Sequence, residues 1–153
     1  MTRPATVQLG DLTHVDEILA YDHVARAGDA ERAAQVHEAA SSGGLLVATR
    51  GQVVLGHAIV RRHVFFGSDF LDLVYVAESG RRAGIGRLLV GAVRDAAQGR
   101  VWTSTNLSND PMHGLLRTTG WQPAGMLHGL DEGDPEVFYF ADREGEDLRV
   151  GGP

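Results

Sequence analysis

The feature that most constrains the fold is a strand, a glycine-rich turn and a helix in direct succession across residues 69–97. Residues 69–76 form the kind of apolar, β-branched run that is typical of a strand. The turn that follows, SGRRAGIGR at 79–87, contains three glycines and three arginines. Apolar residues then recur at helical spacing: Ile85, Leu88, Leu89, Ala92, Val93 and Ala96. Backbone N–H groups in the first turn of a helix lack partners, so this segment predicts an anion site.

Two common phosphate-binding motifs do not fit this turn. A dinucleotide fingerprint beginning at Gly84 would need a third glycine where Leu89 stands. A P-loop needs a lysine, and all 14 basic residues of the chain are arginine. The absence of lysine also excludes Schiff-base chemistry. The remaining interpretation is a general one, in which glycines and helix-start amides hold a multiply charged anion against the backbone.

The composition indicates one soluble domain. A chain of 153 residues is long enough to bury a core of its own. The net charge of −6 argues against nucleic acid as a partner, because phosphate backbones attract basic surfaces. With no cysteine there is no thiol nucleophile and no covalent cysteine intermediate. No apolar run approaches the length of a membrane span or a secretory signal, so we expect no membrane partner and a cytoplasmic location.

The order of predicted elements indicates an α+β fold. Strands and helices are expected in the order β, α, α, β, β, β, α, β, α, β, β, which places a β-meander before a βαβ unit. The expected ranges are 6–9, 13–27, 29–40, 45–50, 52–66, 69–76, 85–98, 100–105, 110–119, 121–130 and 136–141. We therefore predict one domain over residues 1–141 and a flexible, charged tail over 142–153.

The turn and a second motif together carry a resemblance to a known family. The sequence RRAGIG, residues 81–86, resembles the R/Q-x-x-G-x-G/A signature of the GNAT acetyltransferase superfamily. Asn109, Gly120 and Trp121 fall in register with that family's second motif. The resemblance covers about residues 6–141. It implies a mixed, mostly antiparallel sheet of six to seven strands, flanked by about four helices and splayed between the fourth and fifth strands.

The resemblance also implies acetyl-CoA as cosubstrate and names the residues that would bind it. The pyrophosphate would lie against the turn, formed by Arg81, Arg82, Ala83, Gly84, Ile85, Gly86 and Arg87. The pantetheine arm would pair with the backbone of Val74 and Val76, and Asn109 would bind it from the other side. The N–H group near Val74 would then stabilise the oxyanion. A possible homodimer is also consistent with the family.

Asp72 is the first candidate for the group that deprotonates an attacking amine. In a regular strand Asp72 shares one face with Phe70, Val74 and Val76, beside the expected thioester, while Tyr75 faces the opposite side and belongs to the core. A structural carboxylate is an equal alternative for Asp72. Glu78, at the end of the strand, is a solvated turn residue or a partner of the helix dipole.

The sequence departs from the family at the residue that would protonate the departing thiolate. A tyrosine is common there, and this chain has Leu116. His113, one helical turn earlier, is the first candidate to replace it, and a surface histidine is the alternative. Ser104 and Thr105 are weaker candidates. The histidines have no paired metal-ligand spacing, so we predict no metal site.

These observations predict an N-acetyltransferase that moves an acetyl group from acetyl-CoA to a primary amine, which attacks directly in a ternary complex. The acceptor would be a small-molecule or peptide amine. The sequence leaves its identity open, because the shape of the acceptor pocket determines it. The alternative is an acyl-CoA-binding or regulatory module of the same fold that has lost turnover, and Leu116 is the feature that keeps this alternative open. A structural or interaction domain that binds no acyl-CoA is the third hypothesis.

Overall fold

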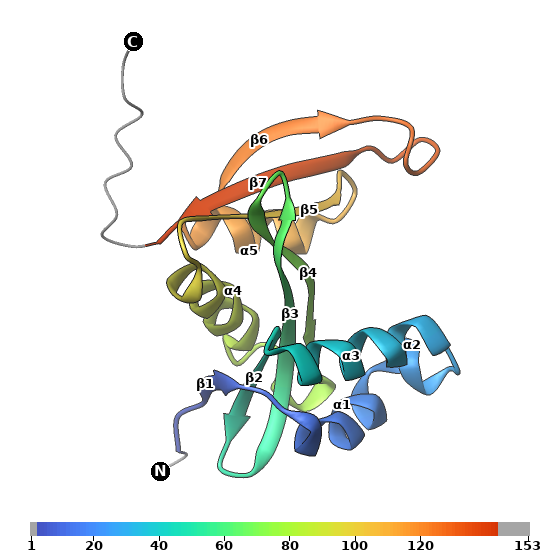
Figure 1. Cartoon of the computed structure of the whole chain (residues 1–153), viewed down its shortest axis with the longest axis vertical. Helices are drawn as coiled ribbons and strands as arrows, with labels where there is room; N and C mark the ends of the chain where they lie inside the picture. Colours follow the sequence, from blue (N-terminus) through green and yellow to red (C-terminus); the bar gives the residue numbers. More distant parts are fainter. Residues whose placement is uncertain (1–2, 144–153) are drawn as a thin grey trace.

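The computed structural model describes residues 3–143, which form one central sheet with helices on both faces (Figure 1). The strands are β1 (Thr6–Leu9), β2 (Leu45–Arg50), β3 (Val53–Phe65), β4 (Ser68–Val76), β5 (Arg100–Asn106), β6 (Gln122–Leu127) and β7 (Glu136–Asp142). The α-helices are α1 (Val15–Tyr21), α2 (His23–Arg26), α3 (Ala30–Ser42), α4 (Ile85–Ala96) and α5 (Asp110–Thr118). Single 3-10 turns, η1 (Leu12–His14) and η2 (Glu78–Gly80), precede α1 and follow β4.

The seven strands lie in the order β1-β2-β3-β4-β5-β7-β6. All neighbouring strands are antiparallel except β4 and β5, which are parallel. These two pair at only three positions, from Asp69 opposite Val101 to Leu71 opposite Thr103. Beyond them the strands separate, which confirms the predicted α+β fold with a splay between the fourth and fifth strands.

The helices bury their apolar faces on opposite sides of the sheet. On one side, α1 and α3 pack Val15, Ile18 and Val36 against β2 and β3. On the other side, α4 packs Ile85 and Leu89 against β3 and β4, and α5 adds Leu116. The i, i+3, i+4 spacing read in the sequence of α4 is the spacing of these buried side chains.

The predicted helix over residues 13–27 is divided into two in the structure, which gives five α-helices. Asp22 has extended backbone (φ −72°, ψ 107°), and its carboxylate accepts hydrogen bonds from the N–H groups of Val24 and Ala25, the first turn of α2. The same buried carboxylate binds Arg32 of α3 at 2.8 Å. Ion pairing therefore fixes α2 beside α3.

The end of the predicted domain lies within β7, which continues to Asp142. Most of the predicted tail, residues 144–153, lies outside the described residues. Among residues 3–143 there is no helix of the length and apolarity that crossing a bilayer requires.

Candidate active site

The separation of β4 and β5 creates a wedge, bounded by Asp72–Val76 on β4 and Ser104–Asn106 on β5. Its narrow end is the last paired position, Leu71 opposite Thr103. The Thr103 hydroxyl donates to the Leu71 carbonyl across this point at 2.8 Å, which fixes where the two strands meet. The open end of the wedge leads to the glycine-rich turn before α4 (Figure 1).

The wedge side of β4 carries backbone donors. Ala77, just after β4, donates its N–H to Leu55 of β3 at 2.8 Å. Backbone N–H groups alternate between the two edges of a strand. The N–H groups of Val74 and Val76 therefore point away from β3, towards the wedge, where β5 no longer pairs with them. An extended amide-containing ligand could take the place of the missing strand.

The turn at the open end leads into α4 with its amides exposed. Gly84 is the N-cap residue and has no side chain that could cap the helix. The first bond at this end of the helix runs from Leu88 N–H to the Gly84 carbonyl, at 3.1 Å. The N–H groups of residues 85–87 precede it and belong to the first turn, whose donors have no intrahelical acceptor. With the positive end of the helix dipole, they form an anion site.

The two glycines of the turn have different roles. Gly84 has φ +75°, a left-handed conformation, and nothing lies within 4 Å of the position a Cβ would take. This glycine therefore shapes the turn and leaves its outer surface open. At Gly86 a Cβ would lie 3.2 Å from Cδ2 of Leu115. The second glycine thus allows α4 to approach α5 closely.

The three arginines of the turn are also not equivalent. Arg81 and Arg82 are exposed and lie before the helix. Arg87, also exposed, donates from Nη1 to the carbonyl of Thr118 at 3.3 Å, near the end of α5. Arg87 thus connects two helices, while Arg81 and Arg82 are the better placed of the three to attract a phosphate.

The prediction that Asp72 shares a face with Val74 and Val76 is wrong, because β4 contains a bulge. Phe70 does lie on the side to which Asp72 turns, and both residues line cavities that include Arg61 and Val64. Ile59 of β3 pairs with Leu73, but the next residue, Val60, pairs with Leu71, so Asp72 is the extra residue. Leu73 packs against the core beneath α1 and α3, and Val74 and Val76 pack against the core beneath α4. Asp72 turns towards α3 with Leu73 and away from the two valines.

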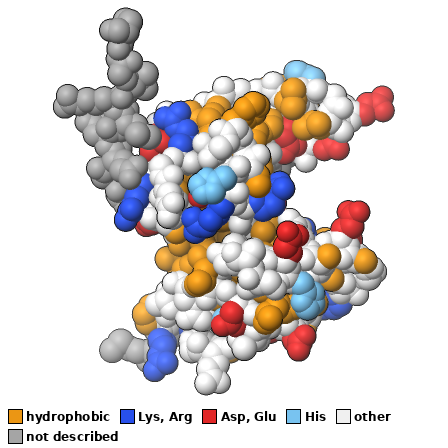
Figure 2. Space-filling model, in the orientation of Figure 1, with side chains coloured by type: hydrophobic (Ala, Val, Ile, Leu, Met, Phe, Trp, Pro, Cys, Tyr) orange, Lys and Arg blue, Asp and Glu red, His pale blue; other side chains and the backbone are white. Residues whose placement is uncertain are grey.

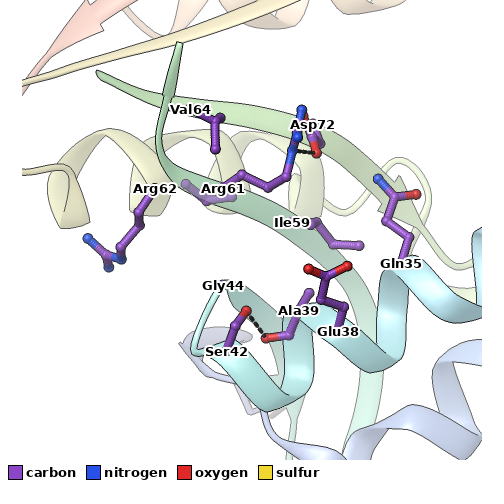
Figure 3. A pocket seen from close by; sticks show the side chains of 11 residues that line it. Gln35, Glu38, Ala39, Ser42, Gly44, Ile59, Arg61, Arg62, Val64 and Asp72 are labelled. Atoms are coloured by element: carbon purple, nitrogen blue, oxygen red, sulfur yellow. Dashed lines mark hydrogen bonds and ion pairs between the residues drawn. The ribbon is translucent and has the colours of Figure 1, made fainter. Parts of the chain in front are cut away.

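Asp72 lies at the edge of a cavity of about 380 Å³ between α3 and the β3–β4 hairpin (Figure 3). Its carboxylate accepts two hydrogen bonds from Arg61 of β3, one from Nε and one from Nη2 at 3.1 Å. The hydrogen bond to Asp72 raises the pKa of Arg61 above its ordinary value. Gln35 and Glu38 of α3 line the same cavity. A cationic group would therefore meet two carboxylates here, Asp72, which is paired with Arg61, and Glu38. Arg62 also lines the cavity, and its guanidinium is paired with Asp69 at 3.6 Å.

The second predicted motif is held firmly by internal hydrogen bonds. Asn109 caps α5 by accepting from Met112 N–H at 3.4 Å, and its amide donates to the Thr105 hydroxyl at 3.0 Å. His113 has both ring nitrogens in use. Nδ1 lies 2.6 Å from the hydroxyl of the buried Tyr139, and Nε2 lies 3.0 Å from the carbonyl of Asn106.

These contacts define the tautomer of His113. A carbonyl can only accept, so Nε2 carries the proton and donates it in a hydrogen bond, and Nδ1 of the neutral ring accepts a hydrogen bond from the Tyr139 hydroxyl. This arrangement connects α5 to β5 and β7, and it leaves neither nitrogen directed at a ligand. The catalytic role of His113 remains a prediction, and its geometry favours a structural one.

Leu116 is fully buried in the core beneath α4 and α5. The side chain that replaces the family's tyrosine therefore contributes packing. Of the two weaker candidates, Thr105 is buried and bound to Asn109. Ser104 is half-buried on the opposite face of β5, where it lines a cavity of about 230 Å³ with Arg61, Phe70 and Phe138.

Sequence analysis missed a cluster of rings beside β4. The sequence predicted Tyr75 to be a core residue, but this side chain is only half-buried. Its hydroxyl contacts the ring of His23, and its own ring stacks on His57 with centroids 5.9 Å apart. The pairing of His57 with Tyr75 across β3 and β4 brings them together, and no local motif predicts it. Tyr75 and His23, together with Tyr21, line a cavity of about 690 Å³. Arg81 of the turn also lines this cavity.

His57 is fully buried, with its Nδ1 at 2.6 Å from the hydroxyl of Tyr21. Burial lowers the pKa of His57 from 6.5 to about 4, against the opposing charge of Asp22. Burial also raises the pKa of the Tyr21 hydroxyl. Both rings are therefore neutral at physiological pH. Among residues 3–143, no group of three or more histidine or acidic side chains is arranged to hold a metal ion.

The family model of the GNAT acetyltransferases matches residues 12–121. The match includes the strand, the turn, α4 and the Asn109 motif. The chain therefore belongs to the GNAT acetyltransferase family. Comparison with curated protein sequences found no match.

Solved structures of this family share the fold. A GNAT-family acetyltransferase from Bacillus cereus is 24% identical with a TM-score of 0.83, over 91% of this chain and 97% of that one. A provisionally assigned acetyltransferase from Salmonella typhimurium, solved with its cofactor acetyl-CoA, is 18% identical (TM-score 0.71; 98% and 100% covered). A ribosomal-protein-alanine N-acetyltransferase from Brucella melitensis is 24% identical (TM-score 0.68; 89% and 98% covered). At these identities the likeness concerns the fold.

Proposed function

We propose that this protein is an N-acetyltransferase that transfers the acetyl group of acetyl-CoA to a primary amine. The observation that carries the proposal is the alignment of three features: the open first turn of α4, the free backbone donors of β4 and the wedge. Together they fit a long, amide-containing thioester with a phosphate group at one end. Family membership and the acetyl-CoA complex of a structural relative support the same conclusion.

The turn would hold the pyrophosphate through the amides of residues 82–87, with Arg81 and Arg82 adding charge. The backbone of Val74 and Val76 would pair with the pantetheine arm in the wedge. Asn109, whose amide donates to the Thr105 hydroxyl of β5, would contact the arm while it caps its helix. These residues together would aim the thioester at the narrow end of the wedge.

The Val74 N–H is the donor that we assign to the thioester oxygen. A donor fixed at this place stabilises the oxyanion that forms when the amine attacks, which in other enzymes contributes on the order of 3 kcal/mol. The C–N bond forms, the C–S bond breaks, and the amine gives up a proton. Asp72, directly or through a water molecule that it orders, would accept this proton.

The thiolate would leave without a protein acid beside it. Leu116 has no ionisable proton to give, and His113 uses both ring nitrogens in hydrogen bonds within the protein. Water at the open wedge can protonate a thiolate, whose conjugate acid is far stronger than that of an alkoxide. The chemistry therefore does not require the missing tyrosine.

The direct experiment measures free thiol released from acetyl-CoA with a panel of primary amines, and identifies the acetylated amine by mass spectrometry. We expect release that depends on the amine and saturates with it. The alternative function, an acyl-CoA-binding module without turnover, is favoured by the burial of Leu116. Saturable acetyl-CoA binding with no thiol release for any amine would support that alternative.

A further inference from the structure

β5 and β7 have one face that no helix of residues 3–143 covers (Figure 1). Buried residues such as Thr103 and Tyr139 point to the α5 side, so their neighbours point the other way. This second face, which we call the open face, consists of Trp102, Ser104, Phe138 and Phe140. The tip of the β3–β4 hairpin lies across it.

Aromatic rings from both parts meet on the open face. Phe65 of the hairpin stacks on Phe138 with centroids 5.7 Å apart, and it contacts Trp102 at 5.4 Å. Phe70 contacts Phe65 at 5.2 Å. Hydrophobic side chains are visible over this part of the molecule in Figure 2. These rings are half-buried, and a contiguous apolar surface that is partly open to solvent marks a candidate binding site.

The aromatic surface is continuous with the narrow end of the wedge. The 230 Å³ cavity contains Ser104, the first β5 residue past the last paired position. Phe65 and Phe138 line this cavity and also line a groove of about 760 Å³ that extends to Met126 of β6. An amine at the wedge would therefore have its remaining atoms directed along the groove.

Charge distinguishes the two ends of this path. At the wedge end, Arg61 lines both the small cavity and the neighbouring cavity that contains Asp72 and Glu38. Arg61 is paired with Asp72 and Arg62 with Asp69, so Glu38 is the carboxylate of this cavity to which no arginine in the described part of the chain is bound in an ion pair. Among residues 3–143, the one charged residue that lines the 760 Å³ groove is Arg100, and no acidic side chain of these residues lines it. Arg100 lies over Phe140 at 4.1 Å and is paired with Asp142. The groove therefore suits an uncharged, apolar body and not a second ammonium group.

We propose that the acceptor is a monoamine with an aromatic or similarly bulky apolar group. The ammonium end enters beside Asp72, and the apolar group lies on Phe65, Phe138 and Met126. Ser104, which lines the small cavity, and Trp102, which lines the groove, are two residue steps apart on β5, or about 7 Å, so a short linker spans the distance between the cavity and the groove. The inference rests on the proposed function, since it names the substrate class of the same site.

The test compares 2-phenylethylamine with ethanolamine and spermidine in the thiol-release assay. We expect kcat/KM for 2-phenylethylamine to exceed that of both by at least tenfold, which is the usual effect of burying a ring-sized apolar group. Equal or better use of ethanolamine or spermidine would overturn the inference and leave the acetyltransferase proposal intact.

A pair of matched variants tests whether the preference for 2-phenylethylamine arises in the groove. Met126→Glu places an acid in the groove, whereas Leu130→Glu places one on a residue that is 62% exposed and outside the groove lining. Met126 is itself 48% exposed, so neither change disturbs the core. We expect Met126→Glu to raise KM for 2-phenylethylamine at least fivefold with kcat nearly unchanged, and Leu130→Glu to change neither. Identical behaviour of the two variants contradicts the inference.

A measurement of amine binding distinguishes a failure of this inference from a failure of the proposed function. If 2-phenylethylamine binds saturably to the CoA-loaded protein, and Met126→Glu weakens this binding without any turnover, the substrate class stands and the transfer reaction does not. A second copy of the chain is the other possible occupant. A dimer in analytical ultracentrifugation that Met126→Glu converts to a monomer would assign the open face to an interface and overturn the inference.

Discussion

Arg61 binds Asp72 through both Nε and Nη2, and it does so at the bulge where β4 leaves β5. The pair fixes the orientation of a carboxylate that a regular strand would have pointed to the opposite face. A positioned carboxylate at the narrow end of the wedge is what the proposed proton transfer requires.

Asp72→Asn keeps the shape of the side chain and removes its basicity. We expect kcat/KM for amine acetylation to fall by roughly 10²–10⁴-fold, which is the usual range for general-base catalysis. Acetyl-CoA affinity should be unchanged, since Asp72 faces α3 and not the turn. Asp16→Asn, an exposed acid on α1, is the control. A rate that survives in Asp72→Asn would remove this carboxylate from the mechanism.

Removal of the His113 ring should affect stability more than chemistry. His113→Ala leaves the buried Tyr139 hydroxyl without its partner, at a cost of about 1–3 kcal/mol in the free energy of unfolding. Tyr139→Phe should relieve part of that cost in the double variant, which urea unfolding can measure. The pH profile of thiol release should keep its shape in His113→Ala. Loss of the basic limb, where the rate falls as a general acid loses its proton, would instead identify His113 as the acid.

The buried His57 predicts how stability depends on pH. Its pKa falls from 6.5 to about 4 on folding, so the unfolded chain binds the proton more readily between these values. The contribution of neutral His57 to the free energy of unfolding is therefore fully present above pH 6.5 and is lost as the pH falls towards 4. The expected loss is about 3 kcal/mol, from 1.36 kcal/mol for each pKa unit. Urea unfolding of the wild type and His57→Gln between pH 7 and 4 should show a smaller slope in the variant. Equal slopes would contradict this account.

Gly86 predicts an energetic coupling between α4 and α5. Gly86→Ala brings a methyl group within 3.2 Å of Cδ2 of Leu115, so we expect this contact to cancel the gain of about 1 kcal/mol that Ala normally brings over Gly in a helix and to leave the protein slightly less stable. Leu115→Ala alone should also destabilise the protein, but the double variant should lose less than the sum. Additive effects in chemical unfolding would mean that the two helices are not in close contact here.

Local sequence signals predicted the elements around the turn well. The spacing of Ile85 and Leu89, with glycines before them, depends only on neighbouring residues, and α4 begins where that pattern indicates. The splay followed from the family resemblance, since backbone donors such as Val74 N–H leave no trace in the sequence. The division at Asp22 was missed because its partner, Arg32, lies ten residues further along the chain.

The candidate catalytic residues were harder to place because their positions depend on distant contacts. The bulge that turns Asp72 towards α3 arises from pairing with β3, which strand alternation alone cannot reveal. The partner of His113 is Tyr139, on β7, and that of His57 is Tyr21, on α1. Each pair joins elements that come together only in the folded sheet.

Isothermal titration calorimetry with acetyl-CoA tests the central claim, which is that the amides before and within the first turn of α4 bind the pyrophosphate of coenzyme A. Gly84→Ala adds a methyl group at the open surface of the turn, where φ is +75°. Gly28→Ala is its matched control, since Gly28 has φ +95° and equally open surroundings far along the chain from the turn. We predict saturable binding by the wild type and Gly28→Ala, and at least tenfold weaker binding by Gly84→Ala. No saturable heat with the wild type, or equal affinity in all three proteins, would contradict the account.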